Sequence, residues 1–190
     1  MFGDLEIGDI VLLQWGAVIG ASLAAAVWDL FRRRIPNWLT LPLLAAGLCQ
    51  AAWRGGLNGL GGALAAGVIL ALPFVVLYVF AGGGAGDAKL MAGIGAWLGV
   101  LQGAVVLAAV ALSGFLLAVV VAAARKRLRS VVSSVAATAF RGLVSILSGA
   151  GLKGVAGVQA PAHPTLTVPY GLAIFMGVCA AAGGRMLWPL

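Results

Sequence analysis

Two aspartates stand at the ends of long apolar stretches, where a charge is costly. Asp29 closes the first stretch and precedes the run RRRIPN, which ends with Pro36 and Asn37. Asp87 lies in the glycine-rich run GGGAGDAK at residues 82–89, which follows another apolar stretch. Because an ionisable residue at membrane depth costs roughly 2.5–3.5 kcal/mol to insert, such a residue indicates a functional site by default.

Two carboxylates that meet at a membrane boundary cannot both ionise cheaply, so the pair is expected to share a proton. In aspartyl hydrolysis, one carboxylate takes a proton from a bound water while the other, protonated, polarises the scissile carbonyl. The residues alone do not assign base and acid between Asp29 and Asp87, because a coupled pair titrates as a unit. No serine–histidine, cysteine–histidine or metal-ligand cluster in the sequence competes with them.

The glycines beside Asp87 have two interpretations. Gly84 and Gly86 carry no side chain, so they would let an extended substrate backbone approach the carboxylate. Alternatively, the run is a plain packing turn and Asp87 caps the following helix, since aspartate is a favoured N-cap residue. The second aspartate favours the functional interpretation.

The composition is that of a membrane protein with several helical spans. Hydrophobic residues make up 63% of the chain, charged residues 9%, and the mean hydropathy is +1.12. The spans must be helices, because an isolated strand leaves its backbone unpaired in lipid. We therefore predict an all-α polytopic protein in which residues 1–190 form a single membrane-embedded domain. The net charge of +7 is interpreted as a topology signal and not as a nucleic-acid site.

About six spans are expected, since each needs about 20 residues. They are the six apolar segments at about 10–28, 38–52, 60–81, 89–100, 102–124 and 169–187. The first span should end at Asp29, with the helix broken before Pro36, because a residue that precedes proline avoids the helical region. Turns are predicted at 55–58 and near 99–103, and Pro73 is expected to kink the third span. Residues 130–157 are predicted to be an amphipathic helix on the interface, with a seventh span as the alternative.

The basic residues predict the orientation. Ten of the twelve, all except Arg54 and Arg185, fall on the same side when the spans are counted. By the positive-inside rule this side is cytoplasmic, so both aspartates should face the cytoplasm and both termini the outside. Cys49 and Cys179, in apolar segments, are expected to be buried and inert.

Three stretches of this sequence resemble the type IV prepilin peptidases, membrane aspartyl proteases of the GxGD class. They are WDLFRRRIPNWLTLP, GGGAGDAKLMAGIGAWLG and VPYGLAIFMG. The likeness is greatest to the small form associated with tight-adherence (Flp) pili. The resemblance implies that Asp29 and Asp87 are catalytic, that Pro36 and Asn37 shape the site, and that Lys89 either anchors its helix at the membrane interface or tunes the pair.

The resemblance also implies the reaction. Such an enzyme removes a short basic leader from a pre-pilin or pseudopilin at the cytoplasmic face of the inner membrane, in pilus biogenesis or secretion. It implies no cofactor and no metal, and only substrate and membrane lipid as partners. The larger members carry an added methyltransferase region with paired cysteines, and we expect no such activity here, since the chain has neither the length nor the cysteines for that region.

Two other classes remain open. In a small ion- or proton-coupled transporter, Asp29 and Asp87 would be ion or proton sites at broken helices. In a structural component of a pilus platform, both acids would be inert.

Overall fold

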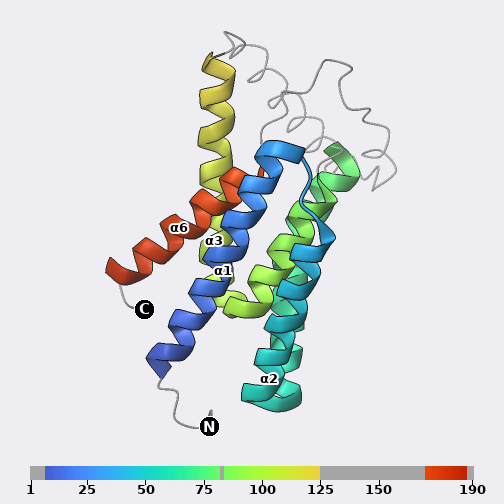
Figure 1. Ribbon diagram of the computed structural model, residues 1–190, viewed down its shortest axis with the longest axis vertical. Helices are drawn as coiled ribbons and strands as arrows, with labels where there is room; N and C mark the ends of the chain where they lie inside the picture. The colour runs from blue at the N-terminus through green and yellow to red at the C-terminus, as the bar shows by residue number, and fades with distance from the viewer. Residues whose placement is uncertain (1–6, 82–83, 125–169, 188–190) are drawn as a thin grey trace, which may run out of the picture.

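Long helices make up the described part of the chain. The computed structural model describes residues 7–81, 84–124 and 170–187, and within these ranges it contains helices and no strand. In chain order, the helices are α1 (Ile7–Arg32), α2 (Asn37–Ala81), α3 (Ala85–Ala124) and α6 (Tyr170–Leu187) (Figure 1). The predicted all-α class is therefore confirmed. The predicted interfacial helix at 130–157 lies outside the described residues.

Each of the two longest helices folds back on itself at a glycine. The backbone leaves the helical region at Gly56 (φ 56°) in α2 and at Gly99 (φ 76°) in α3, and Figure 1 shows the chain reversing direction at both places. Glycine has no Cβ, so it adopts a positive φ without steric penalty. Both reversals fall where the sequence predicts turns. Pro73 lies inside α2, and the helix is not broken there. The residue of α2 with non-helical dihedral angles is Gly56.

The surface of these helices is apolar and several polar groups are buried, which is the reverse of a water-soluble protein. Large apolar side chains are exposed along every described helix, while Ser22, Asp29 and Thr40 are buried. Cys49 and Cys179 are also exposed, so the expectation that both are buried is wrong: they face outward with the apolar residues. By length and composition α1, α2 and α3 could each cross a membrane, and α6 is a shorter apolar helix. The count of six spans stays a prediction.

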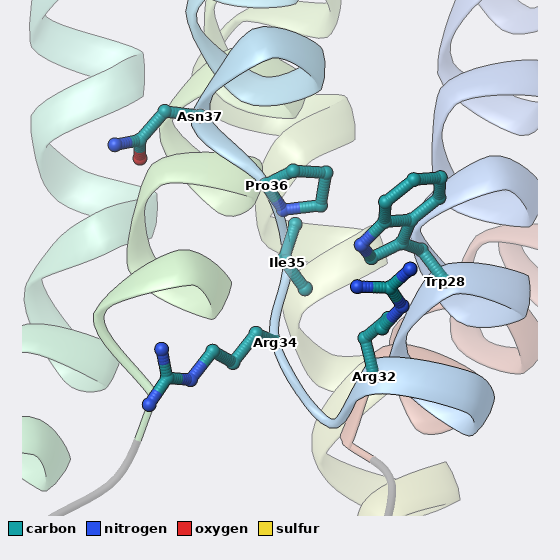
Figure 2. Close-up of a pocket in the computed structure, with 6 residues that line it drawn as sticks. All are labelled: Trp28, Arg32, Arg34, Ile35, Pro36 and Asn37. Carbon is teal, nitrogen blue, oxygen red and sulfur yellow. The ribbon is translucent and has the colours of Figure 1, made fainter.

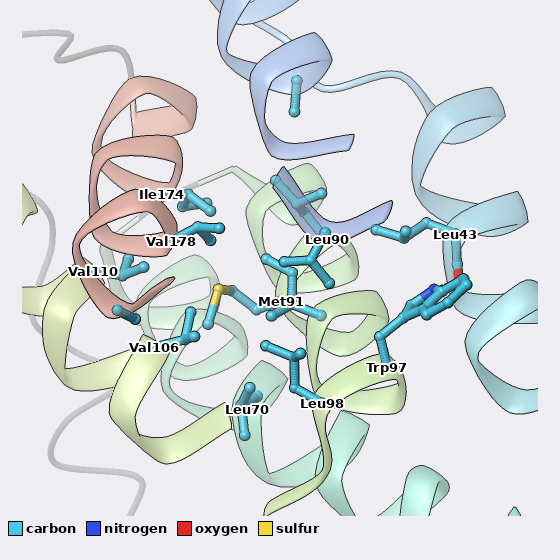
Figure 3. Close-up of a cluster of buried hydrophobic side chains, with 14 of the residues drawn as sticks. Leu43, Leu70, Leu90, Met91, Trp97, Leu98, Val106, Val110, Ile174 and Val178 are labelled. Atoms are coloured by element: carbon cyan, nitrogen blue, oxygen red, sulfur yellow. The ribbon is translucent and has the colours of Figure 1, made fainter. Parts of the chain in front are cut away.

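The part of α3 that precedes Gly99, which we call its first arm, is the centre of the packing. Leu90, Met91 and Ile94 are completely buried, and α3 contacts each of the other three described helices. Figure 3 shows Met91 between the valines of α3 and α6 on one side and Leu90 and Leu98 on the other. Because this arm begins at Ala85, the core holds the start of α3, with Asp87, in a defined place.

The ends of the helices gather at two ends of the bundle. The last turn of α1 and the first turns of α2, α3 and α6 lie at one end, which we call the aspartate end (Figure 1). The start of α1 and the reversals at Gly56 and Gly99 lie toward the other end, which we call the glycine end. Both aspartates therefore lie at the same end of the bundle, and their position relative to a membrane stays a prediction.

Candidate active site

Helix α1 continues one turn beyond the predicted end. The sequence suggested that the span stops at Asp29, but α1 ends at Arg32, and the amide of Arg33 donates a hydrogen bond to the Asp29 carbonyl (2.8 Å). Arg33 adopts a left-handed conformation (φ 51°), which terminates a helix and is usually supplied by glycine. Asp29 is therefore held on the last turn of a helix and is not part of a loop.

The segment after α1 crosses to α2 and starts it. The helix breaks before Pro36, as predicted, and the Pro36 carbonyl accepts hydrogen bonds from the amides of Leu39 (3.2 Å) and Thr40 (3.3 Å). These bonds occupy two amides of the first turn that have no partner within the helix. Pro36 thus fixes where α2 begins, and its predicted role in shaping the site stays a prediction.

The Asp29 side chain is bound by the first turn of α6. It is 8% exposed, and its Oδ2 accepts a hydrogen bond from the amide of Gly171 (2.9 Å). The first amides of a helix lack intrahelical partners and carry partial positive charge, so they suit a carboxylate. A Cβ at Gly171 would lie 2.9 Å from the Asp29 Cβ, so residue 171 must lack a side chain for this contact to form.

The Asp87 carboxylate lies in the first turn of α3. The helix begins at Ala85, and the amide of Asp87 donates to the Gly84 carbonyl (3.2 Å). Asp87 is therefore the third residue of the helix and not its N-cap, which corrects the alternative interpretation of this run. Its carboxylate is partly buried and interacts electrostatically with Asp29 and Tyr170. Three helices thus bring Asp29, Asp87 and the start of α6 together.

The two glycines beside Asp87 have different neighbours. A Cβ at Gly84 would lie 2.9 Å from Oδ2 of Asp87, whereas a Cβ at Gly86 would lie 2.8 Å from the Cβ of Ile35 and 3.1 Å from its carbonyl oxygen. The space at Gly86 is thus taken by the α1–α2 connection of this chain itself. Gly86 has a packing role here, and Gly84 alone adjoins the carboxylate.

Lys89 and Asn37, two residues that the sequence singled out separately, contact each other. The Lys89 ammonium donates to Oδ1 of Asn37 (2.8 Å), and both side chains are exposed. The bond joins the second turn of α3, two residues after Asp87, to the first residue of α2. Neither of the two roles left open for Lys89 is tested by this contact, and both stay predictions.

Sequence reasoning missed Tyr170 and Gly171 as site residues. Both lie in the stretch VPYGLAIFMG, so a signal was present, but nothing in that stretch indicates contact with an aspartate so distant along the chain. In the described ranges no three His, Cys, Asp or Glu side chains are grouped as they would be to hold a metal ion. The chemistry that these ranges offer is that of two neighbouring carboxylates with a tyrosine hydroxyl nearby.

Comparison with known proteins gives one family. The model of the type IV leader peptidase family matches residues 16–122. Two curated proteins named prepilin leader peptidase/N-methyltransferase, from Burkholderia pseudomallei strains 1026b and K96243, are each 40% identical over 104 residues. The match covers 48% of this chain and 32% of each relative, so the chain spans only about a third of their length. No solved structure matches significantly.

Proposed function

Because the chain belongs to the type IV leader peptidase family, we propose that it is a membrane aspartyl endopeptidase that removes the leader of a pre-pilin, with Asp29 and Asp87 as catalytic carboxylates. The observation that carries the proposal is the convergence of both acids at one end of the bundle. Asp29 comes from the last turn of α1 and Asp87 from the first turn of α3. The proposal concerns leader cleavage alone and not N-methylation.

The reaction needs one proton on the pair. The ionised carboxylate takes a proton from water, and the resulting hydroxide equivalent attacks the scissile carbonyl. The protonated carboxyl donates a hydrogen bond to the carbonyl oxygen and stabilises the tetrahedral intermediate. As the C–N bond breaks, a proton passes to the leaving amine and the pair returns to its starting state. The amide of Gly171 holds Asp29 in place throughout.

The position of the pair suits a substrate that is itself anchored in the membrane. A pre-pilin or pseudopilin of the Flp type would keep its hydrophobic helix in the bilayer and present the leader junction at the boundary, where the aspartate end lies. Arg32, Arg33 and Arg34 follow Asp29 after two intervening residues, and such clusters mark the cytoplasmic side. A transporter is less well supported, because coupling-ion sites lie near the bilayer midplane and both acids lie at one end.

Cleavage of a pre-pilin peptide by the purified full-length chain in detergent tests the proposal. The peptide should contain the basic leader and the first turns of the hydrophobic helix, and mass spectrometry should find one cut between them. The double variant Asp29→Asn/Asp87→Asn is expected to leave the peptide intact and to elute like wild type in size exclusion. Cleavage by this variant at the wild-type rate would contradict the assignment of both residues.

Alkaline phosphatase fusions test the orientation. We expect high activity for fusions after Gly56, at the glycine end, and low activity after Arg34, at the aspartate end. High activity after Arg34 would place the aspartates on the side that a cytoplasmic leader cannot reach.

A further inference from the structure

An open cavity of about 650 Å³ lies beside the aspartate end and takes no part in the chemical steps of the proposed cleavage. It is lined by Trp28, Arg32, Arg34, Ile35, Pro36 and Asn37. In Figure 2, Arg32 lies next to the Trp28 ring, and Arg34 extends to the opposite side of the connection between α1 and α2. Neither Asp29 nor Asp87 lines this cavity.

The two arginines of the cavity lack an anionic partner in the described part of the chain. Arg32 stacks over the Trp28 ring, with its guanidinium carbon 5.8 Å from the ring centroid. Asp29 is buried and bonded to Gly171. Among the described acids, Asp29 and Asp87 are the two at the aspartate end, and neither forms an ion pair with Arg32 or Arg34. Within the described residues, Arg32 and Arg34 are therefore free to bind an anion of another molecule.

The surroundings of the cavity are those of a membrane interface. Trp28 and Trp38 pack edge to face, with ring centroids 5.5 Å apart. The neighbouring side chains point outward and are apolar: Phe31 is 82% exposed and Trp38 is 61% exposed. Tryptophan is enriched at headgroup depth because its ring is both apolar and polar, and apolar side chains beside it can contact acyl chains. A ligand here would meet two guanidinium groups and an apolar surface together.

From this combination we propose that the cavity binds the phosphate headgroup of an anionic phospholipid. Guanidinium groups bind phosphate with paired, charge-assisted hydrogen bonds. The apolar rim favours a lipid over free phosphate, which has no acyl chain. The leader that we propose as substrate is itself basic, so it does not supply the missing charge. The lipid would hold the α1–α2 connection, which adjoins both Asp29 and Gly86, against the membrane surface.

Lipid titration of the full-length chain in neutral detergent, followed by native mass spectrometry, tests the proposal. The probes are dioleoyl phosphatidylglycerol, dioleoyl phosphatidylcholine and inorganic phosphate, with a hexaglutamate peptide as competitor. Measurement in about 0.5 M ammonium acetate screens diffuse charge attraction and leaves direct contacts. We expect phosphatidylglycerol to bind at least about tenfold more tightly than phosphatidylcholine, and neither inorganic phosphate nor the peptide to displace it.

A pair of charge-matched variants isolates the cavity. Arg32→Gln/Arg34→Gln should weaken phosphatidylglycerol binding about thirtyfold, because each basic residue at a membrane surface contributes about fivefold. The control Arg33→Gln/Arg185→Gln removes the same charge, but neither residue lines the cavity, so it should change binding less than about twofold. Arg32→Lys/Arg34→Lys keeps the charge and should retain part of the affinity, which shows that loss in the glutamine variant is not misfolding.

Several results would overturn the proposal. Equal losses in the two charge-matched variants would mean that the attraction is diffuse. Equal affinity for the two lipids would remove the role of the anionic headgroup. Displacement by inorganic phosphate or by hexaglutamate would assign the cavity to a soluble anion or to an acidic peptide. Each of these results is independent of whether the chain cleaves a pre-pilin.

Discussion

Helix α1 has two long-range hydrogen bonds, one toward each of its ends, and each bond joins a side chain of α1 to the backbone of another helix. The two bonds differ in the charge of the side chain and in whether it donates or accepts. At the aspartate end, Asp29 accepts from the amide of Gly171 in α6 (2.9 Å). At the glycine end, the Gln14 amide donates to the Trp97 carbonyl in α3 (2.8 Å) and approaches the Gln50 side chain (3.4 Å). One bond uses a charged acceptor and the other a neutral donor.

The difference separates catalysis from packing. The neutral Gln14 amide donates to the Trp97 carbonyl, beside the break at Gly99, with only a small loss of hydration free energy. Burial of a carboxylate loses much more hydration free energy. Of these two bonds, the one with a buried charge is therefore at the end where the proposed chemistry needs it, and the bond at the glycine end is neutral. Changes at the two aspartates, and at the groups that contact their carboxylates, should lower activity before stability, and changes at the glycine end should do the reverse.

The largest effect is expected from Asp29→Asn and Asp87→Asn. Each single variant should lower kcat by about 10⁴-fold or more, and the double variant should be no worse, because residues that act as a unit lose function non-additively. Initial rates of pre-pilin cleavage measure this. A single variant that keeps a tenth of the wild-type rate would show that the two carboxylates do not work as a pair.

A second effect is expected from Gly171→Ala. The added Cβ would lie 2.9 Å from the Asp29 Cβ and would push the carboxylate from its amide donor, and a displacement of about 1 Å can cost about 100-fold in rate. The control is Gly183→Ala in the same helix, where a Cβ meets nothing within 4 Å. Equal rates for the two variants would remove Gly171 from the site.

The two glycines beside Asp87 should respond differently to alanine. Gly84→Ala would displace the Asp87 carboxylate and lower the rate about tenfold with little change in stability. Gly86→Ala would press on Ile35 and lower the free energy of unfolding by about 1–3 kcal/mol, as overpacking does. Thermal unfolding in detergent and initial rates on the same samples distinguish them. Unchanged stability in Gly86→Ala would restore the interpretation of Gly86 as part of a substrate cradle.

The smallest effect on activity is expected at the glycine end. Gln14→Leu removes the donor to the Trp97 carbonyl and should lower the free energy of unfolding by about 1 kcal/mol, while kcat stays within twofold. A fall in kcat comparable with that of Gly171→Ala would show that the two ends are coupled and would end the separation proposed above.

The sequence by itself determined the features that depend on neighbours along the chain. Apolar length and composition predict the helical class, and Pro36 correctly predicts the break between α1 and α2. The reversals fall at Gly56 and Gly99, within the predicted turns, because only glycine adopts those dihedral angles without cost. The two aspartates were recognisable because charge is rare in so apolar a sequence.

Only the tertiary structure decided which groups these acids meet. The amide that binds Asp29 lies 142 residues away along the chain, and no local pattern marks it. Likewise, the space left by Gly86 looks open in the sequence, yet Ile35 fills it. The pairing of Lys89 with Asn37 depends on how α2 and α3 pack. The physical reason is the same in each case: helix formation is a local property, whereas the contacts of a helix end depend on which other helix ends the buried core brings beside it.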